Sequence, residues 1–192
     1  RRGLERIGRI LPTSESRMTP SEMQVTIQAV VSAASRLSAR QHGALIVLQR
    51  SESLSDYART GVGLQARVTP ELLLQIFYPN TPLHDGAAII EGNHVLAAAC
   101  VLPLSASGIL VRTPDRQMGL RHRAALGISE DTDAIAVVVS EESGFISIAH
   151  GGRMIRRLDP ERLENILTAF YRPENESRNF LNRAFPFMKR DK

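Results

Sequence analysis

Residues 134–139 form an unbroken apolar run, in which four of the six side chains are Ile or Val. Continuous runs of β-branched residues are typical of strands that are buried on both faces, so this segment predicts a central strand of a sheet. Residues 43–49 contain a second apolar run and predict another buried strand. A sheet with such strands needs other elements on both of its faces.

Two pairs of apolar segments are each separated by a short turn that contains glycine. This pattern is typical of β-hairpins. Hairpins together with buried strands favour a mixed sheet over a purely parallel one. The predicted hairpins join residues 87–91 to 95–101, and residues 145–149 to 153–156.

Three segments begin with a Thr or Asp followed by Pro and then Glu, a combination typical of helix N-termini. They predict helices at residues 19–40, from residue 69 to before Pro79, and at residues 159–170. A fourth helix is predicted at residues 122–130. The strands and helices together predict an α/β fold with a mixed central β-sheet covered by helices on both faces, in a single domain.

The predicted domain spans residues 19–170, between an amphipathic N-terminal segment and linker (1–18) and a C-terminal tail (171–192). The net charge is +4, yet residues 1–18 and 183–192 each carry a net charge of +3. Because a nucleic-acid-binding face needs clustered positive charge on the folded body, nucleic acid is not expected as a partner. The single cysteine, Cys100, excludes an internal disulfide and a cysteine-rich zinc site.

Residues 83–87, Leu-His-Asp-Gly-Ala, lie between a proline-rich loop and a predicted strand. A carboxylate at the mouth of a strand, followed by small residues, is suited to holding a divalent cation or orienting a hydroxyl nucleophile. Asp85 supplies the carboxylate, and His84 is a neighbouring ligand or hydrogen-bond donor. The alternative is an ordinary turn Asp beside a hairpin glycine.

Residues 119–125 place Arg121, His122 and Arg123 at a predicted helix start, after a glycine. Guanidinium groups and the positive end of a helix together suit a triphosphate. A solvated basic helix start is the alternative, although basic residues are disfavoured at that end of a helix. The chain has neither a GxGxxG nor a GxxxxGK[ST] motif, so a Rossmann or P-loop site is not expected.

Ser140, Glu141 and Glu142 follow the most apolar predicted strand. Ligand sites in α/β sheets favour the carboxyl ends of strands. The Ser140 hydroxyl is placed to bind a phosphate there, and a Glu to share a metal with Asp85. A hairpin turn with solvated acidic side chains is the alternative.

Taken with their flanks, these motifs resemble the diadenylate cyclase domain. The resemblance runs from residue 43 to about residue 167, and includes Asp-Gly-Ala at 85–87 and Arg-His-Arg at 121–123. Their flanks read PNTPLHDGA, AAACVLPLS and RHRAALGISEDTDAIAVVVSEES. The nearest resemblance is to the membrane-anchored bacterial type, which implies a cytoplasmic domain anchored in the cell membrane through a segment upstream of Arg1.

The resemblance implies that the chain joins two ATP molecules into cyclic di-AMP, across a homodimer in which each domain holds one ATP. It also implies Mg²⁺ or Mn²⁺ as a cofactor. The implied residues are Asp85 as the catalytic carboxylate; Gly86, Ala87, Leu102, Arg121, His122, Arg123, Ser140 and Glu141 as ATP-binding residues; and Asp85, His84 and Glu142 as metal ligands.

Two features depart from the family pattern. Leu120 stands where the family usually has Thr, so a hydroxyl that reaches phosphate is missing. A catalytically silent sensor of ATP or cyclic di-AMP on the same fold is therefore the alternative function. The loop at residues 108–119 is longer than usual, which affects the face expected to meet the second subunit.

Overall fold

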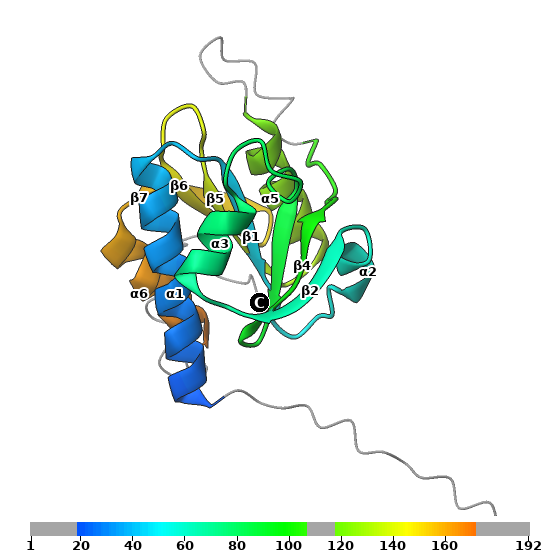
Figure 1. The fold of residues 1–192 in the computed structure, drawn as a ribbon, viewed down its shortest axis with the longest axis vertical. Helices are drawn as coiled ribbons and strands as arrows, with labels where there is room; N and C mark the ends of the chain where they lie inside the picture. The colour runs from blue at the N-terminus through cyan, green and yellow to red at the C-terminus, as the bar shows by residue number, and fades with distance from the viewer. Residues whose placement is uncertain (1–18, 107–117, 172–192) are drawn as a thin grey trace, which may run out of the picture.

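The computed structural model describes residues 19–106 and 118–171, which form one seven-stranded sheet with helices around it (Figure 1). The strand order is β2-β4-β3-β1-β5-β6-β7. Strands β1 and β3 are parallel, and every other neighbouring pair is antiparallel, which confirms the predicted mixed sheet. The elements are α1 (Pro20–Ala39), β1 (Ala44–Leu48), α2 (Ser55–Ala58), β2 (Val62–Arg67), α3 (Pro70–Ile76), β3 (Ala87–Glu91), β4 (His94–Cys100), α5 (Leu120–Asp131), β5 (Ile135–Val139), β6 (Ile146–His150), β7 (Arg153–Leu158) and α6 (Pro160–Tyr171).

The three predicted helix starts are capped as expected. Thr19 and Glu22 form a reciprocal capping box at α1, and the Thr69 hydroxyl accepts a hydrogen bond from the Leu72 N–H at α3. At α6, the Asp159 carboxylate accepts from the Arg162 N–H at 2.7 Å. These bonds satisfy N–H groups that a helix leaves unpaired in its first turn, so each helix begins at its capped residue.

Helices cover both faces of the sheet. One core lies beneath α1, α3 and α6, and the second lies beneath α5 and α2. The five residues of β5 alternate between these cores: Ile135, Val137 and Val139 face the first, and Ala136 and Val138 face the second. The predicted central position of this strand is confirmed, because all five residues are buried. Figure 1 shows α1 and α3 in front of the strands.

The segment between residues 50 and 68 contains two elements that the sequence did not predict. Strand β2 is an edge strand that pairs only with β4, and most of its side chains are exposed. An exposed edge strand needs no apolar run, so its sequence carries little signal. The short helix α2 has no buried residue.

Several predictions lie outside the described residues: the amphipathic segment 1–18, most of the loop 108–119 and nearly all of the tail 171–192. Within residues 19–106 and 118–171, no helix is both long and apolar enough to cross a membrane.

Candidate active site

The motif residues meet at one edge of the sheet because of how the strands are paired. Val139, the last residue of β5, lies opposite Ala44, the first residue of β1. Strand β3 runs parallel to β1, so the segment before Ala87 reaches the same edge. The ends that carry Asp85 and Ser140 are therefore only two strands apart.

A cleft of about 890 Å³ opens at this edge of the sheet. It contains residues from all three predicted motifs and from the N-terminus of α5. The three motifs, which lie far apart in the sequence, therefore converge on one cleft. The lining residues are His84, Asp85, Met118, Gly119, Leu120, Arg121, His122, Val139, Ser140, Glu141, Glu142, Ser143, Phe145, Ser147, Arg156 and Arg157.

Arg121 links two of the motifs. Its Nη1 lies 2.5 Å from Glu141 Oε2, and its Nη2 donates to the His84 carbonyl oxygen at 3.2 Å. Its Nε is buried and has no hydrogen-bond partner among the described residues. Through its two Nη atoms, the guanidinium therefore joins the start of α5 to the segment before β3 and the segment after β5.

The N-terminus of α5 opens onto the cleft beside Arg121. Its N-cap residue, Gly119, has no side chain with which to bind the first-turn N–H groups. Uncapped N–H groups at a helix start attract anions, and the helix dipole favours negative charge there. Burial and the nearby charge of Arg156 lower the pKa of His122.

Gly43, which was not predicted as a site residue, leaves space for the ion pair between Arg121 and Glu141. A Cβ at this position would lie 2.7 Å from Arg121 Nη1 and 2.8 Å from Glu141 Oε2. The absence of a side chain at the start of β1 therefore lets the ion pair pack against the sheet edge. Nothing in the sequence around residue 43 distinguishes this role from that of an ordinary loop glycine.

Gly86 holds Asp85 in place through the backbone. Its φ is +112°, which is rare for residues with a side chain, and a Cβ would lie 2.7 Å from the Ala99 carbonyl carbon. Gly86 was predicted to bind ATP through a close approach of its backbone. The close neighbour observed here is β4, and Gly86 does not line the cleft.

Replacing Gly86 by Ala is expected to destabilise the fold by at least about 2 kcal/mol, because the side chain adds backbone strain and a clash with β4. Gly63→Ala is the matched control, since a Cβ there meets nothing within 4 Å. Its effect should stay within about 0.5 kcal/mol. Urea denaturation measures both, and equal stability of the two variants would contradict the role given to Gly86.

Besides Gly86, three more of the residues predicted to bind ATP do not line the cleft. The side chains of Ala87 and Leu102 are buried in the core beneath α5. The contact implied for Leu102 is through its backbone to the adenine, and this stays a prediction. The Arg123 Nε donates to the Ser105 carbonyl oxygen at 3.3 Å, away from the cleft. The reason is helical geometry: residues two apart point about 200° apart around a helix, so Arg121 and Arg123 face different sides.

The three predicted metal ligands do not form a preformed metal site. Among the described residues, no three His, Cys, Asp or Glu side chains are grouped so as to hold a metal ion. His84 Nδ1 lies 2.5 Å from the Thr81 carbonyl oxygen, which can only accept a hydrogen bond, so Nδ1 is the donor and Nε2 is the nitrogen left for another partner. Mg²⁺ is usually held by one or two carboxylates together with substrate phosphates, so a cleft with Asp85, Glu142 and His84 fits such a shared ion.

Comparison with known proteins identifies the family. The family model described as "DAC: DisA bacterial checkpoint controller nucleotide-binding" matches residues 31–154, which include all three motifs. The chain belongs to the DAC family.

The chain is also similar to named bacterial proteins. It is 45% identical over 174 residues to "Cyclic di-AMP synthase CdaA" of Bacillus subtilis (strain 168), covering 90% of this chain and 62% of the relative. It is 46% identical over 169 residues to the "Diadenylate cyclase" of Listeria monocytogenes, covering 87% and 60%. The chain thus spans about 60% of the length of these relatives.

Solved structures confirm the predicted fold. A double mutant of DacA from Staphylococcus aureus matches with a TM-score of 0.69 and 42% identity, over 77% of this chain and 95% of that one. A hypothetical membrane spanning protein from Bacillus cereus matches with a TM-score of 0.63 and 46% identity, over 68% and 62%.

Proposed function

We propose that this chain is the catalytic domain of a diadenylate cyclase, which condenses two ATP molecules into cyclic di-AMP and releases two pyrophosphates. The observation that carries the proposal is that Asp85, Arg121 and Ser140 line one cleft, in a chain 45% identical to a cyclic di-AMP synthase. A carboxylate opposite a guanidinium suits this chemistry, because phosphoryl-transfer enzymes work largely by positioning and charge stabilisation.

The reaction consists of two identical substitutions. The 3′-hydroxyl oxygen of one ATP attacks the α-phosphorus of the other, a new P–O bond forms, and the bond to the β-phosphate's bridging oxygen breaks. Pyrophosphate leaves with the bonding electrons, and the hydroxyl proton passes to solvent. The second substitution closes the ring. Asp85 orients the attacking hydroxyl at the cleft wall.

The phosphates are held on the α5 side of the cleft. The Arg121 guanidinium lines this side, and the first turn of α5, which has no side-chain cap, supplies N–H donors. The Ser140 hydroxyl and the His122 imidazole, which line the same cleft, supply further donors. Preorganised donors of this kind stabilise the charge that develops on the α-phosphate.

Asp85, Glu142 and the Nε2 of His84 would hold Mg²⁺ or Mn²⁺, with nucleotide phosphates as the remaining ligands. When bound, the ion supplies positive charge that offsets the phosphate charge and lowers the pKa of the attacking hydroxyl.

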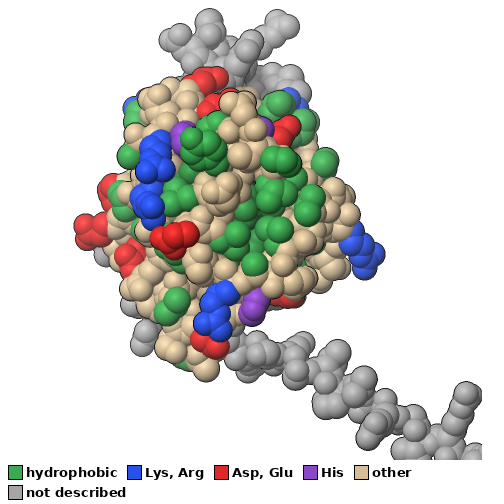
Figure 2. Space-filling view, in the orientation of Figure 1, with side chains coloured by type: hydrophobic (Ala, Val, Ile, Leu, Met, Phe, Trp, Pro, Cys, Tyr) green, Lys and Arg blue, Asp and Glu red, His purple; other side chains and the backbone are tan. Residues whose placement is uncertain are grey.

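Two domains are needed, because each supplies one ATP to the other. Large apolar side chains are exposed at the cleft edge of the sheet: Leu120 is 68% exposed and Val101 is 69% exposed. Figure 2 shows hydrophobic side chains gathered on the face that carries α3. Exposed apolar surface of this kind favours association with a second copy.

A catalytically silent sensor is the second candidate, and Leu120 favours it because the side chain at this cleft position cannot donate a hydrogen bond to phosphate. Incubation with ATP and Mn²⁺ separates the two functions. We expect cyclic di-AMP and pyrophosphate in a ratio of about one to two, as the reaction stoichiometry requires. A metal chelator should abolish the product. ATP binding without product at any protein concentration would favour the sensor.

The whole protein is proposed to be membrane-anchored, with this domain in the cytoplasm. The support is the similarity to the Bacillus cereus protein described as membrane spanning.

A further inference from the structure

Strand β7 contains a bulge where it borders the cleft. Ile146 of β6 lies opposite Leu158, whereas Ile148 lies opposite Ile155. Ser147 therefore faces two residues of β7, Arg156 and Arg157. Bulges occur next to active sites and re-aim side chains there, because the extra residue breaks the regular alternation of the strand.

The bulge directs two neighbouring arginines to the same side. In a regular strand, successive side chains point to opposite faces, yet both Arg156 and Arg157 line the cleft. Arg157 adopts a φ of +57°, a conformation that favours glycine. Glycine would adopt this φ with less backbone strain than arginine. The presence of arginine here therefore indicates that its side chain has a function.

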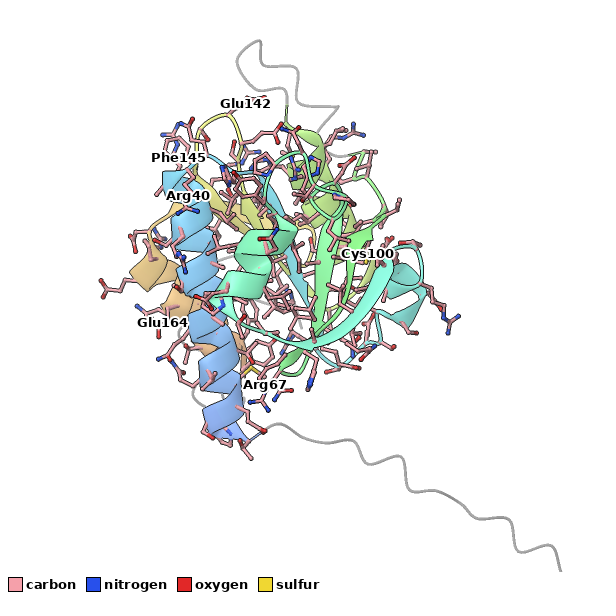
Figure 3. All side chains as sticks on the ribbon, viewed as in Figure 1. Arg40, Arg67, Cys100, Glu142, Phe145 and Glu164 are labelled. Carbon is pink, nitrogen blue, oxygen red and sulfur yellow. The ribbon has the colours of Figure 1, made fainter. Side chains whose placement is uncertain are left out.

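Phe145 supports the Arg157 side chain. The Arg157 Cζ lies 5.0 Å from the centre of the Phe145 ring, which is 48% exposed and also lines the cleft. A cation–π contact holds a guanidinium in position while its N–H groups stay available. Figure 3 shows Phe145 and Glu142 at the same end of the molecule.

Apart from the Arg121–Glu141 ion pair, the acidic and basic residues of the cleft come from different strands. Asp85, Glu141 and Glu142 come from the segments next to β3 and β5, while Arg156 and Arg157 come from β7. Strand β7 is two strands from β5, or about 10 Å at the usual strand spacing. Arg156 lies close enough to His122 for its charge to lower the pKa of that imidazole. Basic residues therefore line the cleft both at the start of α5 and on β7.

We propose that Arg157, together with Arg156, forms a subsite on the β7 bulge that binds the β- and γ-phosphates of ATP and the pyrophosphate leaving group. This inference rests on the proposed cyclase function, because it takes ATP as the ligand. The triphosphate of an ATP bound at Arg121 would extend past β6 to β7. Guanidinium groups suit this role, since they pair with phosphate oxygens through two parallel hydrogen bonds. The Arg157–Phe145 pair is thus proposed to bind the outer phosphates of ATP, whereas the reaction itself is proposed to take place at Asp85.

Arg157→Gly tests the subsite without straining the fold, because glycine tolerates the positive φ. We expect the variant to be at least as stable as the wild type to heat. Its affinity for inorganic pyrophosphate, measured by isothermal titration, should fall about ten-fold, and its KM for ATP should rise by a similar factor. Affinity for AMP should not change, because AMP lacks the outer phosphates.

Arg67→Gly is the matched control. Arg67 is an exposed arginine at the end of β2, on the opposite end of the molecule from Phe145 (Figure 3). It should leave pyrophosphate binding unchanged. Arg157→Lys, which keeps the charge, should restore part of the affinity.

The outcomes separate the subsite from the cyclase function. If the wild type forms cyclic di-AMP but Arg157→Gly binds pyrophosphate as tightly as the wild type does, the proposed subsite is ruled out and the proposed function is not. If the wild type neither binds ATP nor forms product, the proposed function is wrong. A loss of affinity for AMP equal to that for pyrophosphate would also overturn the subsite, since it would indicate a general distortion of the cleft.

Discussion

Asp85→Asn is expected to fold and to bind ATP, but to lose about 100-fold or more of the rate of cyclic di-AMP formation. The substitution keeps the size and shape of the side chain and removes its negative charge. Gly86 fixes the backbone at this position through its packing against β4, which the change does not touch. The loss should therefore fall on kcat rather than on stability.

Initial rates with ATP and Mn²⁺, together with thermal denaturation, measure the two effects separately. Asp56→Asn is the matched control, because Asp56 forms an exposed ion pair with Arg59 on α2 and does not line the cleft. It should keep the wild-type rate. The Mn²⁺ concentration needed for half-maximal rate should rise in Asp85→Asn, since one of the proposed ligands becomes a weaker one.

An Asp85→Asn enzyme with the wild-type rate would mean that Asp85 is only a turn residue, which was the alternative drawn from the sequence. A variant that melts much earlier than the wild type would assign Asp85 a structural role instead. Circular dichroism distinguishes this second result from a purely catalytic loss.

The architecture could be predicted from the sequence because local signals and burial agree along most of the chain. The apolar run that became β5 is buried on both faces, and the helix starts at Thr19, Thr69 and Asp159 are capped as their sequences indicate. These signals are local, so they are readable without knowledge of the fold. Strand β2 lacked them because an edge strand is held by backbone pairing with β4 rather than by burial.

The site was predicted less completely because its geometry depends on contacts between distant segments. The room that Gly43 leaves for Arg121 and Glu141 joins three separate segments. The bulge at Arg157 arises from pairing between β6 and β7. Neither feature has a sequence pattern of its own. The motif Arg-His-Arg was interpreted as one unit, whereas the helix divides its two arginines between different surroundings.

That division leads to a prediction with a large effect. Arg121→Ala should weaken ATP binding about 100-fold, because it removes a charged donor that pairs with phosphate. It also leaves Glu141, now without its 2.5 Å ion pair, as an uncompensated negative charge in the cleft. This charge repels the triphosphate and adds to the loss. Arg121→Lys should recover little, since a single ammonium cannot replace the guanidinium contacts to Glu141 and the His84 carbonyl oxygen.

Arg123→Ala is the matched control, because it removes the same charge only two residues away on the same helix. In the wild type, the Arg123 guanidinium donates a hydrogen bond to the Ser105 carbonyl oxygen. Arg123→Ala should therefore lose some thermal stability and keep its ATP affinity within about three-fold of the wild type. Isothermal titration with ATP under metal-free conditions compares the two variants without turnover. Equal losses of affinity in Arg121→Ala and Arg123→Ala would show that both arginines contact the nucleotide. This result would contradict the orientation of α5 in which only Arg121 faces the cleft. A loss confined to Arg121→Ala would show that, of the two arginines in this motif, Arg121 binds the phosphates.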